Sequence, residues 1–320
     1  MQTLPLLTFE PLFQRYLWGG RRLGGVLGKA IGPGDNYAES WEIVDHSDGQ
    51  SVVADGPLVG RTLGEVVEEH NALLFGRHAP QQKFPLLLKF LDANRTLSVQ
   101  VHPNDAQGAK LDPPDLGKTE AWVVLAAEPG AKIYAGLRAG VDREGLAAAM
   151  EAGTCDACLH VIEPAVGDCV FIPAGTVHAL GEGIVIAEIQ QASNTTFRLF
   201  DWNRVDKDGQ PRPLHIRQSL EVTDFDRGPV EPQTPEPTGD GAQRLVTCDK
   251  FVLERRELAE GWTLPQDDRF HILAVVAGEA VANAGEQSIA LTLGSAVLAP
   301  ARRPSTVVSG EAVLLDMYLP

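Results

Sequence analysis

The sequence has few cysteines and no long apolar run, and each shortage excludes a class of protein. Four cysteines in 320 residues do not make a disulfide framework. No stretch of about 18 apolar residues indicates a membrane span. The N-terminal segment lacks the basic start, apolar centre and small-residue cleavage site of a signal peptide. We therefore expect a cytoplasmic protein with no membrane partner.

Basic residues are also scarce. The chain has 27 Lys and Arg against 43 Asp and Glu, which gives a formal net charge of -16. Phosphate backbones need a basic surface, so this charge argues against nucleic acid as a partner. A small anionic substrate is still compatible, because exposed charges are screened beyond about 8 Å and the local charges of a pocket decide binding.

Short β-rich runs separated by turns dominate the first two thirds of the chain, a pattern typical of an antiparallel sandwich or barrel. Two helices are expected, over 62–75 and 141–152, with Thr62 and Asp142 as their N-caps. The expected strands cover 40–44, 51–54, 85–91, 96–101, 121–127, 131–135, 169–172, 184–190 and 196–201.

A second, smaller β lobe is expected at the C-terminus. Residues 228–242 are rich in proline and glycine and have no periodicity, so they predict a linker between domains 1–227 and 243–320. Segment 294–305 repeats the glycine turn, apolar strand and proline of segment 167–178, but it ends in serine where the first copy has histidine. The same comparison aligns Glu120 with Phe270. The second lobe is expected to have strands over 245–258, 270–277, 288–291 and 296–299.

Polar side chains cluster on two of the expected strands. Residues two apart on a strand point to one face, so Ser98, Gln100 and His102 share one side. Lys118 and Glu120 have the same spacing immediately before an apolar strand. A third segment has the pattern G-x5-P-x-G-x2-H, in which a turn, a strand and a chain reversal present His178. Together these segments indicate a shared site.

The G-x5-P-x-G-x2-H pattern resembles the second metal motif of the cupin superfamily. The first cupin motif normally carries two histidines two residues apart and a glutamate a few residues later. Here Gln100 stands for the first histidine, and Glu120 lies eighteen residues after His102. Both departures are features of the type I phosphomannose isomerases in their short bacterial form.

The resemblance to that family extends over most of positions 9–224. It implies a mainly β fold, with a cupin (jelly-roll) β-barrel, few helices and a second, smaller, degenerate cupin-like β lobe that is free of metal. It also implies interconversion of mannose 6-phosphate and fructose 6-phosphate. The matched segments are 16–23 (YLWGGRRL), 38–46 (AESWEIVDH), 84–105, 117–125 (GKTEAWVVL), 166–180, 186–204 and 214–220 (LHIRQSL).

The family's metal ligands fall on Gln100, His102, Glu120 and His178. Two imidazoles, a carboxylate and an amide oxygen suit one zinc ion per chain with room for water or substrate, although other divalent metals fit the same donors.

The remaining site residues also follow from the resemblance. Aldose–ketose isomerisation moves a proton between two carbons through an enediol, and it needs a base and a proton donor. The family pattern points to Glu188 as the base and to Lys89 as a nearby group for proton handling. Arg198 matches the family's active-site arginine and could hold a phosphate or stabilise the enediolate. Lys118 and Ser98 are expected to bind the substrate.

Two aromatic residues near these segments, Trp18 and Trp41, are interpreted as core packing. Two other functions remain open, an iron-dependent cupin oxygenase and a non-catalytic sugar-binding protein. The first usually has a histidine-rich metal set, which Gln100 does not match, and the second has little need of both a metal and an acid–base carboxylate. The expected partner is a small sugar phosphate, and the expected state is a monomer or weak homo-oligomer.

Overall fold

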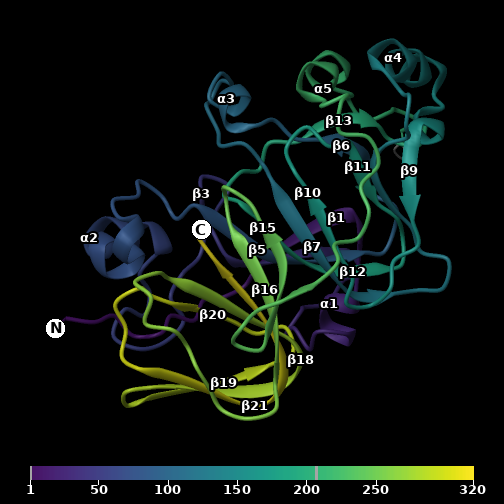
Figure 1. The fold of residues 1–320 in the computed structure, drawn as a ribbon. Helices are drawn as coiled ribbons and strands as arrows, with labels where there is room; N and C mark the ends of the chain where they lie inside the picture. Colours follow the sequence, from purple (N-terminus) through teal and green to yellow (C-terminus); the bar gives the residue numbers. More distant parts are fainter. Residues whose placement is uncertain (1, 206–207) are drawn as a thin grey trace.

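The computed structural model describes residues 2–205 and 208–320 and is mainly β (Figure 1). The helices are α1 (Arg22–Gly25), α2 (Leu63–Phe75), α3 (Asp105–Gly108), α4 (Arg143–Ala152) and α5 (Ile216–Val222), with 3-10 turns at Gly76–His78 and Cys155–Cys158. The strands are β1 (Leu12–Gly20), β2 (Tyr37–Ile43), β3 (Asp45–His46), β4 (Gly49–Gln50), β5 (Leu86–Ala93), β6 (Val99–Val101), β7 (Glu120–Ala127), β8 (Ile133–Leu137), β9 (Leu159–Ile162), β10 (Cys169–Ile172), β11 (His178–Leu180), β12 (Ile184–Gln191), β13 (Phe197–Phe200), β14 (Glu236–Pro237), β15 (Ala242–Thr247), β16 (Val252–Leu258), β17 (Trp262–Thr263), β18 (His271–Ala284), β19 (Gln287–Thr292), β20 (Ala296–Ala299) and β21 (Thr306–Tyr318).

Three large sheets make up the fold. A six-stranded sheet has the order β1-β2-β5-β12-β7-β10, and a five-stranded sheet has the order β13-β6-β11-β8-β9. The C-terminal sheet runs β14-β15-β16-β21-β18-β19, with β20 also paired to β18 and β17 to β21. In the described part of the chain the hydrogen-bonded ladders stay open, so the first lobe is a double-sheet jelly roll rather than one closed barrel. The predicted mainly β, cupin-like class is confirmed in this form.

The six-stranded sheet is the middle layer, and alternation along its strands sends side chains to two different environments. On β5, Leu88 and Phe90 pack in a core that also contains Phe270 of the C-terminal lobe. Leu91 points the other way, into a core shared with the five-stranded sheet. Lys89 has the same parity as Leu91, so the sheet places its ammonium between the two sheets of the first lobe.

Both predicted helices are present. Thr62 caps α2 in a capping box with Glu65, and Asp142 caps α4 by accepting a hydrogen bond from the Gly145 amide. Two long strands were not predicted, β1 and β21. The sequence of β21 is interrupted by Ser-Gly-Glu, and Gly310 has a φ of 140° there, so the apolar alternation is broken inside one continuous strand.

The C-terminal lobe contacts the N-terminal segment of the chain and pairs with part of the predicted linker. Leu7 forms a bridge to Leu298, and the predicted linker contains β14, which pairs with β15. The domain boundaries themselves remain a prediction. No helix among the described residues is long and apolar enough to cross a bilayer.

The strand register corrects one detail of the sequence repeat. Glu120 pairs with Ile172 of β10, and in the second lobe His271 pairs with Ala299 of β20. Segment 167–178 aligned on 294–305 matches Ile172 with Ala299, so the counterpart of Glu120 is His271 and not Phe270. A continuous apolar run lacks the alternation that specifies register, which explains the one-residue error.

Candidate metal centre

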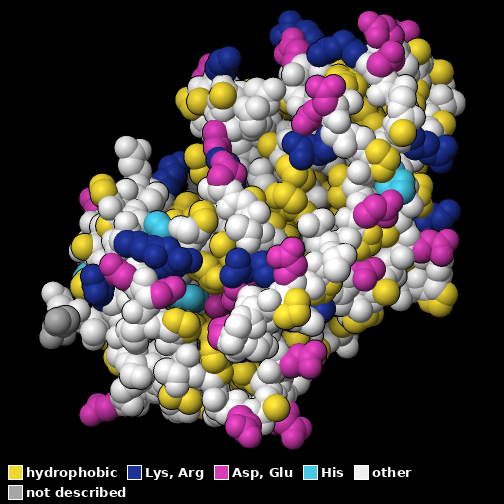
Figure 2. Space-filling view, viewed as in Figure 1, with side chains coloured by type: hydrophobic (Ala, Val, Ile, Leu, Met, Phe, Trp, Pro, Cys, Tyr) yellow, Lys and Arg dark blue, Asp and Glu magenta, His cyan; other side chains and the backbone are white. Residues whose placement is uncertain are grey.

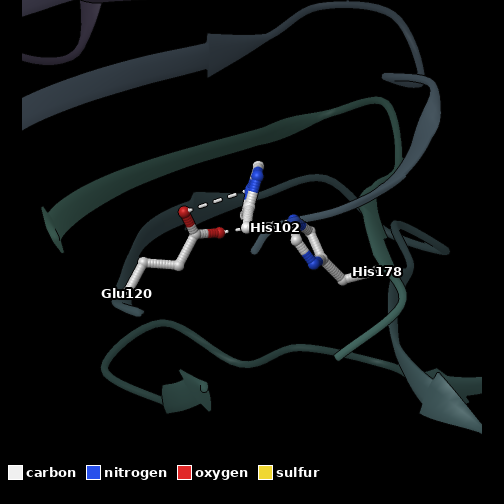
Figure 3. Close-up of side chains that lie close together, drawn as sticks. All are labelled: His102, Glu120 and His178. Atoms are coloured by element: carbon white, nitrogen blue, oxygen red, sulfur yellow. Dashed lines mark ion pairs between the residues drawn. The ribbon is translucent and has the colours of Figure 1, made fainter. Parts of the chain in front are cut away.

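Three side chains from different segments meet between the two sheets of the first lobe. His102, Glu120 and His178 each offer a donor atom, and these atoms all lie within 4.8 Å of one another (Figure 3). Glu120 Oε2 is 3.5 Å from His102 Nε2, and Glu120 Oε1 is 3.4 Å from His178 Nε2. Each carboxylate oxygen therefore faces one imidazole, and the dashed lines in Figure 3 join the Glu120 carboxylate to both rings.

Strand ends bring these residues together. Glu120 is the first residue of β7, His178 is the first residue of β11, and His102 directly follows β6. The Gly175 amide donates a hydrogen bond to the His102 carbonyl, which fixes the chain reversal before β11 against β6. Gly175 has a φ of 86°, in the left-handed region, so the glycine of the motif has a conformational reason.

Both imidazole rings are oriented by backbone carbonyls. His102 Nδ1 lies 2.9 Å from the Thr195 carbonyl oxygen, and His178 Nδ1 lies 2.9 Å from that of Thr176. Each Nδ1–H donates to its carbonyl, which leaves the Nε2 lone pair directed at the centre, an arrangement that metal-binding histidines share. Burial lowers the pKa of His178 to about 4 and lowers that of His102 well below its usual value. Both rings are therefore neutral at physiological pH.

The donor set fits a divalent cation. His102 Nε2 and Glu120 Oε2 are buried and have no hydrogen-bond partner, which is uncommon for polar atoms in a protein interior. Two neutral imidazoles and a carboxylate are ligands that zinc and similar metals accept. The Gln100 side-chain amide is 3.2 Å from His178 Nε2, so a half-turn of that amide would present its oxygen to the same point.

A pocket opens beside these donors, between the six-stranded and five-stranded sheets. All nine residues singled out from the sequence are gathered here, with His102, Glu120 and His178 as the buried group. The other six line the pocket: Lys89, Ser98, Gln100, Lys118, Glu188 and Arg198.

A buried row of charges crosses the pocket floor. Lys89 Nζ is 3.1 Å from Glu188 Oε1 and 3.6 Å from Glu39 Oε2. Burial raises the pKa of Glu188, and the charge of Glu120 raises it further, while Lys89 and Lys118 oppose the shift. Burial alone would lower the pKa of Lys89, but Glu188 and Glu39 outweigh it and raise the value above the ordinary range. Lys89 is therefore a cation beside a carboxyl group that holds its proton more strongly than usual.

Two further cationic groups lie at different ends of this pocket. Lys118 Nζ is 3.3 Å from Glu120 Oε2, next to the metal donors. Arg198 pairs with Gln100 across β13 and β6, and its Nε donates to the Ser98 hydroxyl at 3.3 Å. Because Ser98 precedes Gln100 on the strand, the guanidinium extends away from His102.

Several lining residues were missed from the sequence. Glu39 lies on the same face of β2 as Trp41, whose Nε1 donates to it at 2.6 Å, and this alternation was the available signal. Trp41 is buried, as expected. Trp18 packs against the core between the two sheets and also lines the pocket, which its interpretation as core packing did not include. Trp18 stacks on Tyr16 with ring centroids 5.5 Å apart and forms an aromatic wall. A tryptophan followed by two glycines has no sequence pattern that distinguishes a pocket-lining residue from a core residue. The other lining residues that were missed are Leu91, Leu97, Trp122, Leu180, Asn194, Thr196 and Arg212.

Comparisons with known proteins give the family. The model of the phosphomannose isomerase type I catalytic domain matches residues 6–120, and that of the mannose-6-phosphate isomerase cupin domain matches residues 242–319. The chain is 37% identical over 305 residues to mannose-6-phosphate isomerase ManA of Bacillus subtilis, covering 94% of each chain. It is 36% identical over 315 residues to mannose-6-phosphate isomerase of Streptococcus mutans, covering 97% of this chain and 98% of the relative.

Solved structures agree with these relatives. The crystal structure of the mannose 6-phosphate isomerase from Bacillus subtilis superposes with a TM-score of 0.90 at 29% identity, covering 99% of this chain and 100% of that one. A putative mannosephosphate isomerase from Archaeoglobus fulgidus has a TM-score of 0.80 at 23% identity, over 100% and 99% of the two chains, and supports the fold. The chain therefore belongs to the type I phosphomannose isomerase family and is an enzyme of the isomerase class.

Proposed function

We propose that the protein interconverts mannose 6-phosphate and fructose 6-phosphate through an enediol, with one zinc ion held by Gln100, His102, Glu120 and His178. The observation that carries this proposal is that a buried cluster of metal donors lies against a pocket that a candidate base lines, because the pocket-lining Gln100 and Lys118 contact His178 and Glu120. His102 Nε2 and Glu120 Oε2 are buried without hydrogen-bond partners. Glu188 lines the same pocket and its pKa is raised by burial.

Glu188 is the residue that moves the proton. An open-chain aldose in this pocket exposes the hydrogen on its second carbon, and a carboxylate within reach can remove that proton and return it to the first carbon. A pKa raised toward neutrality makes both transfers easier, because the same group must accept the proton and then release it. The neighbouring Lys89 stays protonated, so its role is to offset negative charge and to hold the Glu188 carboxylate at 3.1 Å.

The cations around the pocket stabilise charge that the reaction develops. When bound, a divalent ion supplies positive charge near the two sugar oxygens. Lys118, beside Glu120, adds an ammonium at the same end. Arg198 and Ser98 are hydrogen-bonded to each other and provide donors further along β6. The aromatic wall of Tyr16 and Trp18 limits the water that reaches the sugar.

Turnover of mannose 6-phosphate before and after chelation tests the proposal. We expect isomerisation in the purified protein, loss of activity after a chelator removes metal, and recovery when zinc returns. Activity that survives complete metal removal, as measured by elemental analysis, would contradict the metal site. Oxygen uptake with iron would instead support the oxygenase, and saturable sugar binding without turnover would support a binding protein.

Three further expectations belong with this proposal and await their own measurements. They are a cytoplasmic location, a monomeric or weakly oligomeric state, and the division of the chain into domains at 228–242.

A further inference from the structure

Arginine side chains gather at one end of the candidate pocket, although the chain as a whole is strongly acidic. On the face drawn in Figure 2, acidic and basic side chains are interspersed over both lobes. At the pocket, however, Arg198 and Arg212 line one wall. Arg212 also lines an adjoining hollow together with Arg95, Arg204 and Asp201.

The arginine group lies away from the metal donors, because its contacts are to residues that come before β6 and His102 comes after β6. Arg204 Nη1 donates to the Thr96 carbonyl at 2.6 Å, and Arg198 Nε donates to Ser98 at 3.3 Å. His102 lies four residues beyond Ser98, which is about 13 Å at the usual rise of an extended chain. The pocket therefore has a metal-donor end and an arginine end.

Arg212 is held in place by a carboxylate. Its Nε donates to Asp201 Oδ2 at 2.7 Å, and its Nη2 donates to Asp201 Oδ1 at 2.5 Å, a bidentate pair. Arg204 shares the same carboxylate. The residue after Arg212 is also fixed, because Arg198 Nη1 donates to the Pro213 carbonyl at 3.2 Å. Asp201 therefore holds the Arg212 guanidinium, and Arg198 holds the backbone next to Arg212.

Among four described groups at this end, the charges do not cancel. Arg198, Arg204 and Arg212 face one carboxylate, Asp201, so two positive charges are left over among these four groups. The pKa of Arg198 is lowered, first by burial and then by the charges of Arg212 and Arg204, with Asp201 opposing them. A phosphate monoester carries about 1.5 to 2 negative charges at neutral pH, and arginine pairs with it through two parallel hydrogen bonds. The excess matches a phosphate dianion.

We propose that Arg212, oriented by Asp201, is a second phosphate-binding arginine beside Arg198, which the family resemblance already links to a phosphate. The sugar phosphate would then lie with its phosphate at the arginine end and its reacting carbons beside the metal donors. This inference rests on the proposed function for the identity of the sugar. It also separates the roles of the cations: Lys118, 3.3 Å from Glu120, belongs to the reacting end rather than to the phosphate. Asp201 is a positioning residue.

The test compares Arg212→Ala with Arg217→Ala in the metal-loaded enzyme. Arg217 is a matched control, because its side chain is 84% exposed on α5 and lines neither the candidate pocket nor the adjoining hollow. We expect Arg212→Ala to raise KM for mannose 6-phosphate by about tenfold to about a hundredfold, the usual weight of a hydrogen bond to a charged group, with a smaller change in kcat. Arg212→Lys should recover part of the loss, and Arg217→Ala should behave as wild type.

A second readout uses inorganic phosphate as the probe, titrated calorimetrically into each protein. We expect phosphate to bind the wild-type protein and the Arg217 variant and to bind Arg212→Ala at least about tenfold more weakly. Unchanged phosphate affinity in Arg212→Ala, with an unchanged KM, would overturn the subsite. A lower kcat with unchanged KM and unchanged phosphate binding would also overturn it. A wild-type protein without isomerase activity would refute the proposed function, and the phosphate titration would still decide on Arg212.

Discussion

The two lobes share the same order of paired strands, but the buried polar residues at matching positions have different partners in each lobe. The order β2-β5-β12-β7-β10 of the first lobe corresponds to β15-β16-β21-β18-β20 of the second. In the first lobe, Glu188 of β12 lies opposite Lys89 of β5 in the strand register. In the second lobe, Asp316 of β21 occupies the matching position and lies opposite Glu254 of β16. The register equivalence of Glu120 and His271 extends this correspondence across the next strand.

The polar groups at these matching positions have different partners. In the second lobe, His271 Nδ1 is 2.8 Å from Asp316 and its Nε2 is 3.2 Å from Asp267. Burial lowers the pKa of His271, but the two carboxylates outweigh it and raise the value to about 9. In the first lobe, burial lowers the pKa of His178 to about 4.

The different partners indicate that the His271 cluster of the second lobe is structural and that the donors of the first lobe form a candidate site. In the second lobe, His271 and its two carboxylates, Asp316 and Asp267, satisfy one another, so this cluster needs nothing from outside. The donors of the first lobe include two buried atoms that have no hydrogen-bond partner, His102 Nε2 and Glu120 Oε2. Burial of polar residues is therefore common to both lobes. At the matching positions, unmet hydrogen-bonding capacity is found only in the first lobe, at Glu120 and Glu188, and not at His271 or Asp316.

The largest expected effect comes from removing a metal donor of the first lobe. We expect His178→Ala to lower metal affinity by more than about a hundredfold, beyond the effect of losing an outer hydrogen-bonding partner, and to abolish isomerisation. Elemental analysis of the purified variant measures this. His160→Ala is the control, since that imidazole is paired with Glu231 away from the pocket. Full metal content in His178→Ala would remove the proposed site.

The next effect compares the two matching carboxylates. Glu188→Gln keeps the shape of the side chain but cannot accept the proton, so we expect kcat to fall by about 10² to 10⁴ with metal content unchanged. Asp316→Asn, at the matching position in the second lobe, should leave kcat as in wild type. Steady-state kinetics with mannose 6-phosphate decide between them. A Glu188 variant with wild-type kcat would mean that another group moves the proton.

A third effect is on stability and belongs to the second lobe. The pKa of folded His271, about 9, lies above its ordinary value, so its charge stabilises the fold fully below about pH 6.5 and the stabilisation is lost as pH rises through about 9. The difference amounts to about 3 kcal/mol. Urea unfolding at pH 6 and pH 9.5 should show this dependence in wild type and a smaller one in Asp316→Asn. An equal dependence in both proteins would contradict the account.

The smallest expected effect is on the orientation of a metal donor. Asp115 accepts hydrogen bonds from the Ser193 and Thr195 hydroxyls at 2.8 and 2.7 Å, and the Thr195 carbonyl accepts from His102 Nδ1. Asp115→Asn weakens this support, so we expect metal affinity to fall by about tenfold, the lower range for such outer contacts. Competition with a metal-binding dye measures the change. A loss as large as that in His178→Ala would mean that Asp115 has a more direct role.

Much of the fold could be predicted from local patterns. Thr62 and Glu65 form a capping box, Asp142 is an N-cap, and both helices begin where these residues indicate. The strand β21 was missed because its alternation is broken at Ser-Gly-Glu, and only pairing with β16 and β18 on both sides keeps it extended. The pairing partners of a strand are distant in sequence, so local patterns do not report them.

For the site, too, local spacing predicts some residues, and others depend on long-range contacts. Gln100, His102 and Ser98 share a face through strand parity, and the sequence alone predicts this. Arg212 and Trp18 could not be identified, because their place in the pocket depends on Asp201 and on how β1 crosses the sheet edge. Trp18 lies in the matched segment 16–23, but that match does not report where the ring points, and Arg212 lies after a polar loop with no periodicity. Residues held by long-range contacts rather than by spacing are the ones that sequence patterns miss.

The most direct measurement is anomalous scattering at the zinc absorption edge from crystals of the purified, zinc-loaded protein. We predict one strong peak in the first lobe, at coordination distance from His102 Nε2, His178 Nε2 and the Glu120 carboxylate, and none beside His271 and Asp316. A peak at the second cluster, or a loaded protein with no peak between the three first-lobe donors, would contradict the account.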